Sequence, residues 1–291
     1  MFPIAKILVP VDFSERGAQA VPFAARIAER FDSEIVLLHV LPPYREFGAI
    51  EMANAMTEIL AYRRQDAERR IAGFLSEELA AHRVRRLLLE GDPAQEIVDC
   101  AHREEAGLIV MPTHGYGPFR RMLLGSVTAK VLHDADCPVW TTAHAEAQPA
   151  GAAALRRVLC AIDLAPSGIR ALKWSAQLAA EFGAQLMLVY GVAELDPRTE
   201  GYYFSPEWRK FLVDNAEAKI AAMQQQAGTR AEVALTMGPA AEMICEEAGK
   251  ADADLLVIGR GADAGIAGMV DRLTGRAYSI IRQSPCPVVS V

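Results

Sequence analysis

Residues 7–14, Ile7-Leu8-Val9-Pro10-Val11-Asp12-Phe13-Ser14, decide the fold because their pattern occurs twice in the chain. It returns as Val158-Leu159-Cys160-Ala161-Ile162-Asp163, where a short apolar run again ends in an aspartate. The two copies also close alike, on Cys137-Pro138-Val139 and on Cys286-Pro287-Val288. A repeat of this length indicates that a whole domain has been duplicated, since solenoid units are much shorter.

The composition narrows the class of protein. A chain of 291 residues is long enough for two domains that each bury a core. The net charge of -7 argues against general nucleic-acid binding, which needs a basic surface. No apolar run is long enough to span a membrane. A strand-like segment follows Met1 almost at once, so we expect no secretory signal and a cytoplasmic location. The five cysteines form no CxxC pair, which favours reduced, mostly buried thiols.

Strand and helix patterns alternate through both copies. We expect strands at 6–11, 34–40, 84–89, 108–111 and 139–142, and again at 157–162, 185–190, 231–236, 254–258 and 287–291. Helical segments separate them, including a long charged one over 51–81. This alternation, with nearly continuous apolar strands, predicts parallel sheets covered by helices on both faces.

The expected architecture is therefore α/β, with two tandem Rossmann-like or flavodoxin-like domains of five strands each. We place the first domain at 1–145 and the second at 155–291. The intervening segment 146–154 contains Pro149 and Gly151 and is typical of a linker.

Candidate binding residues follow the strands of the first copy. Open parallel sheets bind ligands at the carboxyl ends of their strands, near the point where strand order reverses. Asp12 comes just after the first strand, Val40 ends the second, and a glycine-bearing loop over 112–126 follows the fourth. That loop carries Arg120 and Arg121 and leads into a helix, whose free amides and partial positive charge suit phosphates. Together these features predict a nucleotide site.

At these residues the chain resembles the universal stress protein family, in two copies. The family's ATP-binding signature is G-x2-G-x9-G-[ST] after the fourth strand, with an aspartate after the first. Gly115, nine further residues and Gly125-Ser126 match this signature, while Pro112 replaces its first glycine. Proline has a fixed φ and no amide proton, so Pro112 cannot donate a hydrogen bond there.

The resemblance implies a strand order of 3-2-1-4-5 and an ATP site in the first copy. It places Pro10, Asp12 and Val40 around the base and ribose. Ribose and phosphates would be lined by Gly115, Gly125, Ser126, Val127 and Thr128, with Pro112 and His114 in the same loop. The nucleotide phosphates would hold Mg²⁺ without dedicated protein ligands. ADP, AMP or a cyclic nucleotide remain open as alternatives to ATP.

The second copy departs further from the signature. Asp163 is kept, but Arg276 replaces the serine, and Asp263 and Asp271 bring negative charge to the loop. We expect at most a weaker second site, formed by Asp163, Gly259, Gly261, Gly275 and Arg276.

We consider three hypotheses for the function of this protein. The first is a stress-response regulator that binds ATP and has at most very slow hydrolysis, because only His114 in the loop suggests a base. The second is a stress scaffold that binds no nucleotide. The third is an adenylating enzyme of a related fold, but neither a Ser-Gly-Gly-x-Asp-Ser loop nor a His-Ile-Gly-His motif is present.

The expected partners are an adenine nucleotide and an unidentified signalling protein, with no nucleic acid and no membrane. Single-domain relatives commonly dimerise through the fifth strand. The resemblance therefore implies that the two halves form an intramolecular pseudo-dimer, with a homodimer of the whole chain as a further option.

Overall fold

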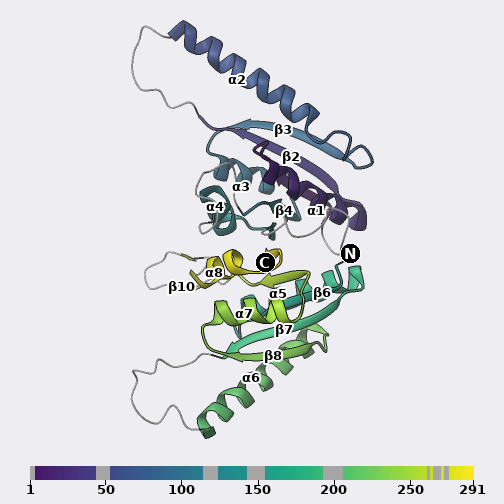
Figure 1. Cartoon of the computed structure of the whole chain (residues 1–291), viewed down its shortest axis with the longest axis vertical. Coiled ribbons are helices and arrows are strands. Elements are labelled where there is room, and N and C mark those ends of the chain that lie inside the picture. Colours follow the sequence, from purple (N-terminus) through teal and green to yellow (C-terminus); the bar gives the residue numbers. More distant parts are fainter. Residues whose placement is uncertain are drawn as a thin grey trace. The chain divides into compact units, whose positions relative to one another are not determined.

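The computed structural model describes residues 4–43, 53–113, 124–142, 155–192, 206–260, 263–264, 270–271 and 275–291. The chain divides into two compact units, Met1–Trp140 and Thr141–Val291 (Figure 1). The predicted linker 146–154 lies outside the described residues.

The first unit is built on a parallel sheet. Its strands are β1 (Lys6–Pro10), β2 (Glu34–Leu41), β3 (Val84–Glu90), β4 (Leu108–Met111) and β5 (Val139–Thr141), in the order β3-β2-β1-β4-β5. Pairs β1–β2, β1–β4 and β2–β3 are parallel. The predicted order is confirmed, and the strand order reverses between β1 and β4.

In the described part of the unit, the helices that cover this sheet are α1 (Glu15–Phe31), α2 (Ala53–Gly73), α3 (Pro93–Arg103) and α4 (Ser126–Asp134). Right-handed crossovers require α1 and α2 on one face and α3 and α4 on the other. In agreement, α1 packs on β1 and β4, α2 packs on β2 and β3, and α3 packs beside α4. The core lies between these layers, where Ile7, Leu8 and Ile109 have no exposed surface.

One helix of the first unit contains a proline, and another is shorter than the sequence predicts. Helix α1 continues through Pro22, with the Ser14 hydroxyl accepting from the Gly17 amide at its start. Helix α2 stops at Gly73, well before the expected end at Ala81, and turns follow it. Leu75 has a φ of 48°, a left-handed conformation that a regular helix does not contain.

The second unit repeats the topology. Its main sheet has β6 (Arg157–Ala161), β7 (Gln185–Val192), β8 (Glu232–Met237), β9 (Leu255–Ile258) and β12 (Val288–Ser290), in the order β12-β9-β6-β7-β8. Its helices are α5 (Pro166–Phe182), α6 (Pro206–Ala227), α7 (Ala240–Lys250) and α8 (Gly275–Gln283). An unpredicted antiparallel pair, β10 (Asp263–Ala264) and β11 (Val270–Asp271), lies within the segment that joins β9 to α8.

The cysteines behave as the sequence predicts. None of the five cysteines forms a disulfide, and Cys100, Cys160 and Cys286 are buried. Burial raises the pKa of the Cys160 thiol to about 12 and that of Cys286 to about 11. Both thiols therefore stay protonated near neutral pH, where they are unreactive. Separately, none of the helices described has the length and apolar character needed to cross a membrane.

Candidate functional site

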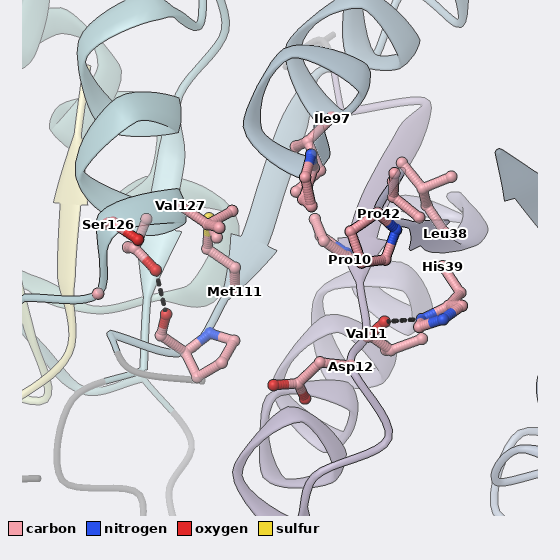
Figure 2. A pocket seen from close by; sticks show the side chains of 15 residues that line it. Pro10, Val11, Asp12, Leu38, His39, Pro42, Ile97, Met111, Ser126 and Val127 are labelled. Atoms are coloured by element: carbon pink, nitrogen blue, oxygen red, sulfur yellow. Dashed lines mark hydrogen bonds between the residues drawn. The ribbon is translucent and has the colours of Figure 1, made fainter. Parts of the chain in front are cut away.

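A pocket of about 430 Å³ lies at the carboxyl ends of β1, β2 and β4 (Figure 2). Its volume is within the range of ordinary small-molecule sites. The pocket forms where the strand order reverses, as open parallel sheets predict. It brings together the described residues of the predicted first site: Pro10, Asp12, Val40, Pro112, Gly125, Ser126, Val127 and Thr128. His114 and Gly115 of that site, and Gly261 of the second, lie outside the described residues.

Part of the pocket wall is formed by residues that the sequence patterns did not predict. Pro93 and Ile97, from the first turns of α3, line the pocket together with Met111 of β4. Helix α3 follows β3, which does not line the pocket. The packing of α3 against β2 brings its first turns to the pocket. His39 also lines the pocket. The sequence could have indicated this, because His39 directly precedes Val40, which was a predicted site residue.

Asp12 has one carboxylate oxygen engaged and one available. Its Oδ1 accepts from the Ser14 amide at 3.0 Å and also from the Ser14 hydroxyl. Ser14 in turn caps α1 through the Gly17 amide. Oδ2 of Asp12 has no hydrogen-bond partner within the part of the chain that the structure describes. Asp12 thus supports the helix cap and still presents an acceptor, and Figure 2 shows its carboxylate on the pocket side of the chain.

The start of α4 is held against the end of β4. The Gly125 amide donates to the Thr113 carbonyl at 2.9 Å, and the Thr128 hydroxyl donates to the Pro112 carbonyl at 3.1 Å. No described side chain caps α4 at Gly125. Its first amides and partial positive charge therefore suit an anion. Pro112 cannot donate, but its carbonyl helps to fix this helix end.

Gly125 does not depend on the special conformational freedom of glycine. Its φ of -59° and ψ of 140° are accessible to any residue. Gly125 lines the pocket, so a side chain at this position would take up space beside the start of α4.

In the second unit, the equivalent aspartate is Asp163, and both of its carboxylate oxygens accept hydrogen bonds from residues at the start of α5. Oδ1 of Asp163 accepts from the Ala165 amide at 3.2 Å, and Oδ2 accepts from the Ser167 hydroxyl at 2.6 Å. Gly259 packs so closely that an added Cβ would lie 3.1 Å from the Ser167 carbonyl oxygen. Both carboxylate oxygens of Asp163 are thus engaged within the unit.

The other described residues of the predicted second site lie at the start of α8. Gly275 is the first residue of α8, and Arg276 beside it is exposed. In the β10–β11 ladder, Asp263 is the backbone partner of Asp271, so the two acidic positions face each other across the pair.

Comparisons with known proteins agree with this architecture. The family model of the universal stress protein family matches residues 3–142 and again 154–291. A universal stress protein of Methanocaldococcus jannaschii is 35% identical over 136 residues, which cover 46% of this chain and 79% of that protein. One of Mycolicibacterium smegmatis is 27% identical over 293 residues, covering 98% of this chain and 96% of the relative.

A solved structure shares the fold over the whole length. The crystal structure of a universal stress protein from Archaeoglobus fulgidus superposes with a TM-score of 0.66, covering 99% of this chain and 98% of that one at 22% identity. With the family model matched twice and the relatives named alike, this chain belongs to the universal stress protein family and carries two copies of its domain in tandem.

Proposed function

We propose that this protein is a stress-response regulator whose first unit binds an adenine nucleotide, with ATP as the main ligand. The observation that carries the proposal is the pocket at the reversal of strand order, which gathers Asp12, Val40 and the start of α4. These residues come from three separate parts of the sequence, and the resemblance to the family assigns all three to one ligand.

The pocket offers suitable chemistry for each part of a nucleotide. Apolar side chains such as Ile97 and Met111 suit the faces of a base. The available oxygen of Asp12 can accept a hydrogen bond from a ribose hydroxyl or an amino group. The uncapped start of α4 suits phosphates. Mg²⁺ would be held by the phosphates, and no cluster of acidic, histidine or cysteine side chains suits a metal ion among the residues described.

The same reasoning favours the first unit over the second. Asp163 already shares both oxygens with α5, and the neighbouring loop carries Asp263 and Asp271. A phosphate group near these acidic positions would meet repulsion, which offsets the gain of about 0.3–1 kcal/mol that an anion has at a helix start. We therefore expect one nucleotide per chain.

Regulation is proposed in preference to catalysis. Phosphoryl transfer requires a positioned nucleophile or water, a metal and charge-stabilising groups in one place. The described residues at the start of α4, Ser126 to Thr128, supply amides and hydroxyls but neither an acid nor a base. Hydrolysis is expected to be absent or very slow, so the nucleotide state would act through a partner protein.

Calorimetric titration of the full chain with ATP, ADP, AMP and cyclic AMP tests the proposal. Nucleotide carried through purification is first released by denaturation and identified by chromatography. We expect one site per chain that prefers ATP. Absence of any adenine nucleotide, both co-purified and titrated, would favour the scaffold alternative. ATP turnover near 1 s⁻¹, in the range of ordinary enzymes, would contradict the regulatory role.

A further inference from the structure

Two aromatic rings and one guanidinium group pack against the ring of Phe13, the residue that follows Asp12. The Phe13 ring is 4.2 Å from the His39 ring and 5.4 Å from the Phe74 ring, measured between centroids. The Arg70 guanidinium lies over the Phe13 ring, 4.3 Å from its centroid. The cluster thus joins the end of β1, the strand β2 and helix α2 with the turn that follows it, and it encloses the residue next to Asp12.

His39 is held in one tautomer. Its Nδ1 lies 2.7 Å from the carbonyl oxygen of Val11, and a carbonyl can only accept, so Nδ1 carries the proton. Burial lowers the pKa of His39, and the nearby Arg70 charge lowers it further. Hydrogen bonding to Val11 and the Asp12 charge oppose this shift without reversing it. The ring is therefore a neutral donor near pH 7.

Phe13 has a backbone conformation that its side chain disfavours. Its φ of 58° lies in the left-handed region, where residues other than glycine are uncommon and strained. The contacts with His39, Phe74 and Arg70 hold the ring while the backbone remains in this state. His39 thus acts on both neighbours of Asp12: it binds the carbonyl of Val11 before it and packs on the ring of Phe13 after it.

We propose that His39 is a positioning residue for Asp12 in the nucleotide pocket. By fixing the turn over 11–13, it keeps Oδ2 of Asp12 directed at the ligand, without touching that oxygen itself. Figure 2 shows the His39 ring and the Asp12 carboxylate on opposite sides of the chain at Val11. This inference rests on the proposed function, because it assigns a role within the same pocket.

The second unit lacks this arrangement. Leu164 follows Asp163 where Phe13 follows Asp12, and Tyr190 occupies the position of His39. Asp163 is instead held by Ala165 and Ser167 of its own helix start. The ring cluster therefore belongs to the unit in which the aspartate keeps an available oxygen.

The test uses the full chain, with adenosine and ATP as titrants. His39→Phe keeps a ring against Phe13 and removes the donor, whereas His39→Asn keeps a donor close to the position of Nδ1. We expect His39→Phe to weaken adenosine and ATP about tenfold each, in line with one lost hydrogen bond. His39→Asn should recover most of the affinity. Tyr190→Phe is the matched control and should bind as the unaltered protein does.

A double-mutant cycle separates positioning from general damage. In an Asp12→Asn background, His39→Phe should weaken adenosine less than about twofold, because the oxygen that it positions is gone. Thermal unfolding checks that each variant is folded. Additive losses, or a His39→Phe variant with unchanged adenosine affinity, would overturn the inference and leave the nucleotide site standing. An unaltered protein that binds neither adenosine nor ATP would overturn the site and the inference together.

Discussion

The Ser167 hydroxyl donates to Oδ2 of Asp163 at 2.6 Å, whereas Oδ2 of Asp12 has no such partner in the described first unit. The two aspartates occupy equivalent positions after equivalent strands. Four residues beyond Asp12 stands Arg16, which has no hydroxyl to offer. One serine in the first turn of α5 therefore accounts for the second engaged oxygen of Asp163.

This difference predicts that only Asp12 matters for nucleotide binding. Asp12→Asn keeps the shape of the side chain. Its one remaining oxygen accepts from the Ser14 amide, so an NH2 group that cannot accept replaces Oδ2, and the bond from a ligand donor is lost. Hydrogen bonds to charged groups contribute about 1.5–3 kcal/mol, which corresponds to a loss of affinity of roughly 10–100-fold. Calorimetric titration with ATP measures the change.

Asp163→Asn is the matched control and should leave ATP affinity within about twofold of the unaltered protein. A strong loss in Asp163→Asn with little change in Asp12→Asn would show that the sites are assigned to the wrong units.

The hydrogen bond from the Thr128 hydroxyl to the Pro112 carbonyl leads to a prediction about the binding of phosphate groups. Thr128 is buried, with 3% of its surface exposed, and its hydroxyl is already used on the Pro112 carbonyl. Thr128→Val removes this bond at nearly constant volume and should loosen the start of α4. We expect ATP affinity to fall about five- to tenfold, the value of one ordinary hydrogen bond, while adenosine affinity stays the same.

Thr128→Ser retains the hydroxyl and should restore most of the ATP affinity. Equal losses for adenosine and ATP in Thr128→Val would instead indicate collapse of the whole pocket.

Gly125→Val should block the phosphate end of the pocket without unfolding the first unit. The backbone at Gly125 already has φ and ψ values that suit valine, so the cost arises from the side chain in the ligand space. We expect loss of measurable ATP binding with a melting temperature near that of the unaltered protein. Gly275→Val is the control, since an added Cβ there meets no atom within 4 Å. Lost binding in Gly275→Val alone would contradict the assignment.

The sequence was sufficient for the topology because the buried strands are short, apolar and repeated. It also predicted that Pro10, Asp12 and Val40 lie together at strand ends, and the structure brings them to one pocket, since parallel strands bring these ends to one edge. It did not reveal the wall from Pro93 and Ile97, which depends on how α3 lies over β2. The antiparallel pair β10–β11 was missed because two-residue strands carry too little pattern to detect.

The role of His39 illustrates the same limit. On a strand pattern alone, its side chain is more consistent with core or edge packing than with a ligand-binding site. Only the contact with Val11 and the left-handed backbone of Phe13 distinguish these roles. Such features arise from long-range packing, which local residue patterns do not encode.

An ion cluster away from the pocket predicts how stability depends on pH. Arg85 forms two hydrogen bonds with the Glu104 carboxylate and one with Glu34 at 3.2 Å, and Lys6 binds Glu104 at 3.2 Å. The Arg85 guanidinium, with Lys6, holds the pKa of Glu104 at about 2, against an ordinary value of 4.5. The folded protein therefore binds the Glu104 proton more weakly than the unfolded chain does.

It follows that the contribution of Glu104 to stability is fully present above about pH 4.5 and is lost progressively as the pH falls toward 2. Arg85 and Lys6 are partly solvated, with 40% and 35% of their side chains exposed. We therefore expect the ion pairs of Glu104 to contribute only about 1–2 kcal/mol to the free energy of unfolding at pH 7. Glu104→Gln should lower the melting temperature by roughly 3–6 °C at pH 7. At pH 2–3 the difference from the unaltered protein should shrink strongly.

Glu105→Gln, at an exposed neighbour, is the control, and thermal unfolding followed by circular dichroism gives the comparison. A Glu104→Gln difference that stays constant from pH 7 to pH 2 would mean that packing, rather than charge, is what Glu104 contributes.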